Sequence, residues 1–287
     1  MSTVIATNTA SLAAQGNLRG AQNALTNSVE RLSSGLRINR AKDDAAGLGI
    51  SEALQKQING VKQGIQNLND GISLAQTAEG ALASVAEIAQ RMIILATQGA
   101  NGTLNGTQNT AIKSEIFALK DSINDIAKRT SFNGTTLFTG AAMKLQASND
   151  SGDVVTISEA ALAKIKISSL DAETTTESKA LFTAIDALTA DITTTKMKAI
   201  QSAAGSFLDS VTSQRGALGA FQNQLEYTVN NLSDFYNNLS AARSRVIDTD
   251  YAAETATLTR GQILQQAATA MLAQANQMPN VVLTLLK

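Results

Sequence analysis

The sequence contains a long line of apolar residues that recurs every three or four positions, and this line rules out most compact folds. Its members are Ile58, Val61, Ile65, Leu68, Ile72, Ala75, Ala78, Leu82, Val85, Ala89, Met92 and Ala96. Such spacing keeps side chains on one face of a helix, so it predicts a single helix with a coiled-coil-like seam from about Asp43 to Gln98. At 1.5 Å per residue this helix is about 80 Å long. A compact globule of this chain length has no room for it.

The same spacing occurs in four other stretches of the chain. It runs from Ile112 to Ile126, from Leu218 to Val246, and through both chain ends. Narrow seams at opposite ends favour pairing of the terminal helices with each other or with other copies of the chain. The candidate assembly core consists of the large members of these terminal seams, namely Leu18, Leu25, Leu32, Leu264, Met271, Met278 and Leu285.

The middle of the chain has a different character. Asn133-Gly134 is a turn signal, and alternation from Met143 to Ala147 before the β-branched segment VVTIS indicates a hairpin. A short helix is expected over 178–191. The predicted fold is therefore mainly α: a long antiparallel helical bundle with terminal coiled-coil helices and a small β-hairpin region. Three parts are expected: residues 1–42 with 246–287, a rod-like bundle of 43–140 with 196–245, and a short insertion over 141–195.

Composition excludes most chemistry. The 287 residues include no Cys, His or Trp, only 3% are aromatic, and 23 basic residues balance 24 acidic ones. Thiol and histidine catalysis and the usual zinc ligand sets are therefore impossible. No basic surface for nucleic acid is expected, and no apolar run is long enough for a membrane span. We expect no enzyme, no metal and no cofactor. The start of the chain also lacks the pattern of a cleaved signal peptide.

Glycines interrupt the long predicted helix at Gly60, Gly64, Gly71 and Gly80. Each costs about 1 kcal/mol relative to Ala in a helix interior, so close packing must offset the loss. Two explanations are open at this point: contacts within the bundle, or contacts between subunits.

Several long strings resemble bacterial flagellin. In the first half they are ERLSSGLRINRAKDDAAGLGIS (30–51), NDGISLAQTAEGAL (69–82) and SFNGTTLF (131–138), and the second half ends in LSAARSRVIDTDYAAETATLTRGQILQQAATAMLAQANQMPNVVLTLLK (239–287). The resemblance implies a structural subunit that self-assembles into the helical flagellar filament, the propeller for motility, outside the cell. It also implies type III export without a cleaved signal peptide, an export chaperone, and filament cap and junction proteins as partners.

The resemblance makes two further statements about single residues. Flagellins are recognised by Toll-like receptor 5 through an Arg, a Leu and a Glu, and the matching positions here are Arg91, Leu95 and Glu115, with Ile94 where an acid is common. The terminal hairpin of one chain is expected to leave an apolar edge unburied, and its members are Ile5, Leu12, Ile263 and Leu286. We therefore expect the termini to order only on polymerisation.

Two alternatives compete with this interpretation. A hook–filament junction-type protein of the flagellum shares the terminal helices, and the short middle with the close match near the C-terminus favours a filament subunit over it. A membrane-active helical protein is the alternative from another class. It is disfavoured because the polar helix faces carry Asn, Gln and Asp rather than Lys and Arg.

Overall fold

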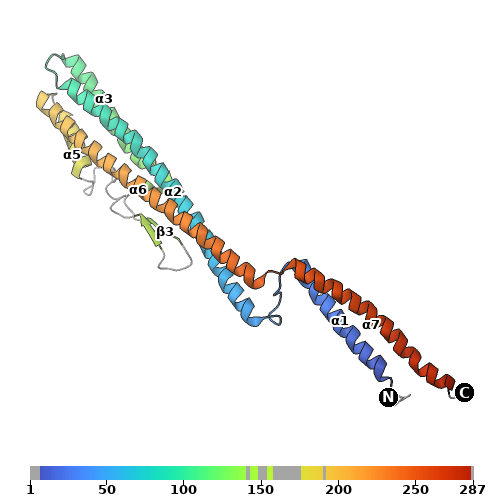
Figure 1. Cartoon of the computed structure of the whole chain (residues 1–287). Helices are drawn as coiled ribbons and strands as arrows, with labels where there is room; N and C mark the ends of the chain where they lie inside the picture. Colours follow the sequence, from blue (N-terminus) through green and yellow to red (C-terminus); the bar gives the residue numbers. More distant parts are fainter. Residues whose placement is uncertain (1–6, 140–142, 148–153, 158–175, 190–191, 286–287) are drawn as a thin grey trace. The chain divides into compact units, whose positions relative to one another are not determined.

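The computed structural model describes residues 7–139, 143–147, 154–157, 176–189 and 192–285, and this part is almost entirely α-helical (Figure 1). The mainly α fold is thus confirmed. The helices are α1 (Thr9–Ser34), α2 (Ala45–Gly99), α3 (Gly106–Arg129), α5 (Thr176–Asp186), α6 (Thr194–Ile247) and α7 (Tyr251–Leu285). The chain divides into two compact units: unit 1 is Met1–Ile58 with Asn238–Lys287, and unit 2 is Asn59–Asn237.

The helix boundaries follow from local capping. Asn105 begins α3 with a capping box, in which its side chain accepts from the Gln108 amide at 2.8 Å and Gln108 Oε1 accepts from the Asn105 amide at 3.0 Å. Before α2, Asp44 Oδ1 accepts from the Gly47 amide at 2.9 Å. The helix therefore starts close to the predicted start at about Asp43. Gly35 ends α1 with φ 73°, a left-handed conformation that glycine adopts without strain.

Two small hairpins follow α3. β1 (Ser131–Phe132) pairs with β2 (Thr135–Thr136), and Asn133 and Gly134 form their turn with φ 49° and 79°. Positive φ at both positions is the hairpin geometry that an Asn-Gly pair favours. After a 3-10 turn at Leu137–Thr139, β3 (Met143–Gln146) pairs antiparallel with β4 (Val154–Ile157). The predicted turn at Asn133-Gly134 and the predicted hairpin of the middle segment are both present, and the connection between β3 and β4 lies outside the described residues.

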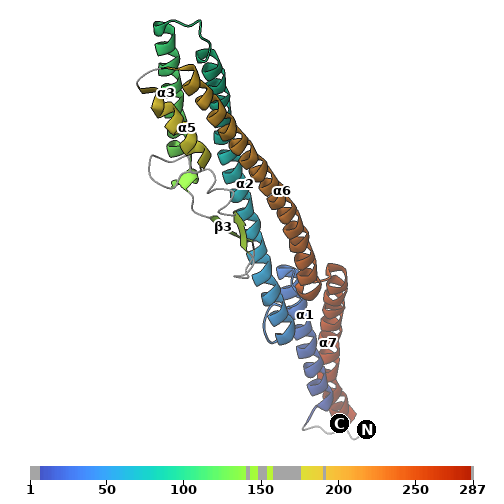
Figure 2. The same cartoon turned by 90° about the vertical axis from the view of Figure 1, so that its left-hand side faces the viewer.

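The core of unit 2 is built on the predicted seams. On α2, Leu68, Leu82 and Met92 are fully buried. The helix α6 runs alongside α2 in both views (Figures 1 and 2), and its buried residues recur every three or four positions from Met197 to Leu225. By length and composition α2 alone among the described helices could cross a membrane, with an 18-residue window of mean hydropathy 1.3. Its buried seam favours a core helix.

Two glycines of α2 are explained by the second hairpin. A Cβ at Gly64 would lie 1.7 Å from the carbonyl oxygen of Ala147, and one at Gly71 would lie 2.3 Å from Leu145 Cδ1. Asn67 Nδ2 donates to the Gln146 carbonyl at 2.9 Å beside them. These glycines therefore let the hairpin strand lie directly on α2, which answers the open question for Gly64 and Gly71 in favour of contacts within the chain. A Cβ at Gly80 would meet nothing within 4 Å.

The helix α5 packs on α3 through a buried cation. Lys120 of α3 is buried, and its Nζ lies 2.5 Å from Asp186 Oδ1 and 5.4 Å from the centre of the Phe182 ring, both on α5. Leu181 and Ile185 of the same helix are fully buried. The described parts of the expected insertion are thus integral to unit 2.

Candidate assembly surface

The terminal helices α1 and α7 form an antiparallel hairpin (Figure 1), and its buried positions are small residues. Ser11, Ala14, Ala21 and Ser28 are buried on α1, and Gly261, Ala268 and Ala275 are buried on α7. A Cβ at Gly261 would lie 3.7 Å from Leu25 Cδ1. Small residues allow a close approach of the two helices, but each buries little apolar surface.

Several large apolar residues of the hairpin lie on its outside. Five of them, between 51% and 65% exposed, are Leu12, Val29, Ile263, Leu264 and Met271. A stable two-helix hairpin buries most of its large apolar side chains, so these residues leave apolar surface uncovered. We call these five residues the outer apolar set. Leu12 and Ile263 were expected on the unburied edge, while Ile5 and Leu286 lie outside the described residues.

The predicted core residues separate into three groups. Leu18, Leu25 and Leu32 of α1 are half-buried in the seam with α7. Leu264 and Met271 are exposed, and the α7 positions buried against α1 are Gly261, Ala268 and Ala275. The role of Leu264 and Met271 in an assembly core stays a prediction. The side chains of Met278 and Leu285 lie outside the described part.

A groove of about 640 Å³ runs along one side of the hairpin. The α1 side is lined mainly by Ala and Gly, including Ala13, Gly16 and Gly20, and the α7 side is raised by Leu264 and Met271. The groove is therefore lined mainly by apolar and small side chains and is open to solvent.

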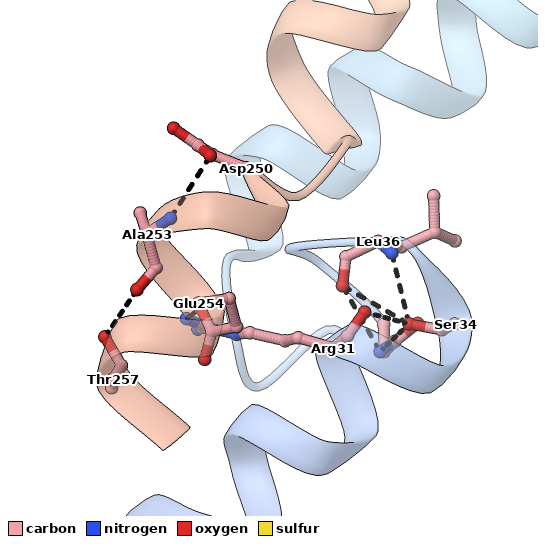
Figure 3. A network of polar contacts seen from close by, with 8 residues as sticks. Arg31, Ser34, Leu36, Asp250, Ala253, Glu254 and Thr257 are labelled. Carbon is pink, nitrogen blue, oxygen red and sulfur yellow. Dashed lines mark hydrogen bonds and ion pairs between the residues drawn. The ribbon is translucent and has the colours of Figure 1, made fainter. Parts of the chain in front are cut away.

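The hairpin begins at a hydrogen-bonded junction (Figure 3). Leu36 and Asp248 form an isolated antiparallel β-bridge. Beside it, Arg37 N donates to the Ile247 carbonyl at 2.6 Å, and Thr249 N donates to the Gly35 carbonyl at 2.9 Å. Across the two helices, Arg31 faces Glu254 at 3.7 Å. The junction fixes the two arms where they start.

Two aspartates near this junction, Asp250 and Asp43, accept backbone hydrogen bonds. Asp250 Oδ1 caps α7 by accepting from the amides of Ala252 and Ala253 at 2.9 and 3.2 Å. Asp43 Oδ2 accepts from the amides of Asn39 and Arg40 at 3.2 and 3.0 Å. Among the described residues, no group of three or more acidic side chains is placed to hold a metal ion.

The three residues matched to receptor recognition are not equivalent. Arg91 of α2 pairs with Glu115 of α3, with 2.7 Å between Nη2 and Oε1, and both side chains are about half exposed. Leu95 is 1% exposed and belongs to the core, whereas the neighbouring Ile94 is 56% exposed. Of these four residues, Arg91, Glu115 and Ile94 are therefore accessible and Leu95 is not.

The two ends of this helical chain pair with each other and leave large apolar residues exposed. Comparison with known families gives the particular class. The family model of the bacterial flagellin N-terminal helical region matches residues 5–143, and that of the C-terminal helical region matches residues 197–286. The chain belongs to the bacterial flagellins.

Relatives that match over nearly their whole length support this assignment. The chain is 41% identical to flagellin of Bacillus subtilis (strain 168) over 306 aligned residues, covering 98% of each chain. It is 35% identical to polar flagellin F of Vibrio parahaemolyticus over 376 aligned residues, covering all of both chains. Among solved structures, a putative flagellar hook-associated protein from Vibrio parahaemolyticus has the same fold, with a TM-score of 0.61 at 17% identity over 72% of this chain and 100% of that one.

The protein is therefore a structural subunit of the bacterial flagellar filament, an extracellular appendage, and not an enzyme. The hook–filament junction alternative is not favoured. The likeness to a hook-associated protein is one of fold alone, because its sequence identity is low.

Proposed function

We propose that the α1/α7 hairpin is the polymerisation element, and that its groove and its outer apolar set are buried by other copies of this chain. The carrying observation is the exposure of five large apolar residues on a hairpin whose buried positions are Ala, Ser and Gly. Residues of the outer apolar set are about half exposed, so complete burial contributes about 1 kcal/mol apiece. The contact is heterologous, because an open helical polymer requires two different surfaces on each subunit.

The same observation supports ordering of the hairpin on assembly. Burial along the α1/α7 seam is small, since its closest positions are Ala, Ser and Gly. Conformational entropy opposes ordering of every residue in the two arms. The arms of a free subunit therefore form a marginal hairpin, and contacts with neighbours supply the missing burial.

Assembly of paired variants tests the proposal. Leu264→Ser with Met271→Ser raises the subunit concentration needed for filament growth by tenfold or more, because burial of both side chains is lost. Ile94→Ser is the matched control, since Ile94 has similar exposure but lies on α2 in unit 2. Sedimentation and electron microscopy after addition of ammonium sulfate measure the effect. Normal assembly of the double variant contradicts the proposal.

We propose recognition of the monomer by Toll-like receptor 5 through Arg91 and Glu115, in line with the resemblance. Support comes from their exposed ion pair and from the exposed Ile94 beside it. Leu95 is buried and supports receptor recognition indirectly, by stabilising the core beneath this surface. Arg91→Ala lowers receptor signalling, while Arg215→Ala, which removes a similarly exposed ion pair with Glu79, leaves it unchanged. Equal signalling by both variants removes the receptor proposal without affecting the assembly proposal.

The remaining partners are proposed from family resemblance. An export chaperone, and the filament cap and junction proteins, are the expected partners, with type III export and no cleaved signal peptide. Mass spectrometry of the filament protein tests the last point, since the intact N-terminal residues are then present. The division into residues 1–42 with 246–287, 43–140 with 196–245, and 141–195 is likewise proposed as the functional division of the chain.

A further inference from the structure

In the described part of unit 2, the buried positions of α6 from Met197 to Leu225 are apolar with one exception. Gln214 occupies the α6 seam between Val211 and Leu218, where the three-and-four spacing places an inward side chain. It is 4% exposed, and its Oε1 has no hydrogen-bond partner in the described part of the chain. A buried carbonyl oxygen without a donor destabilises the folded state, because its hydration is lost and not replaced.

Neighbouring polar groups at this level are also incompletely satisfied. Arg215 Nη2 lies 3.4 Å from Glu79 Oε1 of α2, which fixes the level at which the two helices face each other. Arg215 Nε is nevertheless buried without a partner among the described residues, and so is Gln222 Nε2 two turns later. Among the described residues, three of the four orphan groups of α6 therefore lie within residues 214–222, and the fourth, Arg243 Nε, lies in the part of α6 that belongs to unit 1.

Glycines coincide with the orphan groups. Gly216 and Gly219 lie in the same stretch of α6, and Gly80 follows Glu79 on α2. A Cβ at any of the three would meet nothing within 4 Å, unlike at Gly64 and Gly71. Packing within the chain does not require glycine at these positions, yet glycine weakens a helix interior. Both long helices thus carry weakening residues at the same level.

We infer that residues 79–80 of α2 and 214–222 of α6 form a built-in flexure of unit 2, at which the helix pair opens and bends more readily than on either side. The buried apolar residues Val211 and Leu225 of α6 lie on either side of this stretch, and Leu218 is buried within it. Local stability also depends on satisfied buried polar groups and on helix propensity, and the orphan groups and glycines of the flexure lower both contributions. The inference concerns unit 2 and does not rest on the proposed role of the hairpin.

Hydrogen exchange of the full-length monomer, read by mass spectrometry, tests the flexure. Peptides covering 212–222 are expected to exchange faster, after correction for intrinsic rates, than peptides covering 197–207 and 225–235 of the same helix. Gly216→Ala slows exchange of 212–222 about fivefold, the fold-change that corresponds to about 1 kcal/mol. Gln214→Met, which keeps the side-chain volume and removes the orphan oxygen, slows it about tenfold.

Gly205→Ala is the matched control, because Gly205 lies on α6 and a Cβ there also meets nothing within 4 Å. It slows exchange near residue 205 and leaves 212–222 unchanged. Equal exchange across the three α6 segments of the native chain overturns the inference, and so does equal slowing of 212–222 by the two alanine variants. Exchange is measured on the monomer, so a variant that fails to polymerise still gives a result.

Discussion

The two helical regions of this flagellin bury opposite kinds of residue. Along α2 and α6 the large apolar side chains, such as Leu82 and Met92, are inside and fully buried. Along α1 and α7 the buried positions are Ala, Ser and Gly, and Leu264 and Met271 are exposed. The first region is stabilised by its own packing, whereas the second leaves apolar surface exposed, which we propose is covered by other copies. On this proposal the same helical spacing serves folding in one region and assembly in the other.

The largest expected contrast lies between two leucine truncations. Leu82→Ala in the core of unit 2 lowers the free energy of unfolding of the monomer by about 2–5 kcal/mol, because it leaves a cavity. Leu264→Ala in the outer apolar set changes it by less than about 0.5 kcal/mol, as expected for an exposed side chain. Urea unfolding of both monomers, followed by circular dichroism, measures the difference. Similar losses in the two variants would mean that the hairpin is packed as tightly as unit 2.

Alanine substitutions at two glycines of α2 are expected to change the free energy of unfolding in opposite directions. Gly64→Ala lowers the free energy of unfolding by about 1–3 kcal/mol, since the added methyl group collides with the Ala147 backbone. Gly80→Ala raises it by up to about 1 kcal/mol, because nothing lies within 4 Å of the new group and the helix propensity improves. Thermal unfolding of both variants measures the two shifts. A gain of stability in Gly64→Ala would contradict the placement of the hairpin on α2.

The buried cation provides a smaller test of whether α5 belongs to unit 2. Asp186→Asn weakens the ion pair of Lys120, and we expect a loss of about 1 kcal/mol because Asp186 is half exposed to water. The exposed pair Arg129–Asp125 supplies the control, and Asp125→Asn there changes stability by less than about 0.5 kcal/mol. Denaturant midpoints of the Asp186→Asn and Asp125→Asn variants measure the two losses of stability. Equal midpoints for the two variants would separate α5 from the stabilising core.

The smallest effect is expected at the proposed receptor surface. Arg91→Ala removes an exposed ion pair with Glu115, so the free energy of unfolding changes by less than about 0.5 kcal/mol. Thermal unfolding of this variant shows whether a loss of receptor signalling reflects contact rather than unfolding. A drop of several degrees in Tm would assign Arg91 a structural role.

Sequence periodicity predicted the long helices well because their seams contain large apolar residues at regular spacing. The α2 seam from Ile58 to Ala96 and both hairpins were found as predicted. In α7 the buried positions are Gly261, Ala268 and Ala275, and Leu264 and Met271 beside them are exposed. Helical spacing does not show which residues of α7 pack against α1 and which stay exposed, because that depends on how closely α1 approaches.

Other features depend on residues that are distant in the sequence. The contact between Lys120 and Asp186 spans 66 positions, and no local pattern marks it. The roles of Gly64 and Gly71 depend on where the second hairpin lies, so the sequence left two explanations open. Leu95 matches a receptor-contact pattern in sequence, and its burial follows from the α2 seam, whose spacing it adjoins at Met92 and Ala96.

The most direct test of the account is hydrogen exchange of the two terminal helices, measured on the same protein as monomer and as filament. We predict that residues 9–34 and 251–277 exchange rapidly in the monomer and become strongly protected in the filament, while residues 68–96 of α2 are protected in both. Terminal helices that are already as protected as α2 in the monomer would contradict the claim that neighbouring copies complete the hairpin.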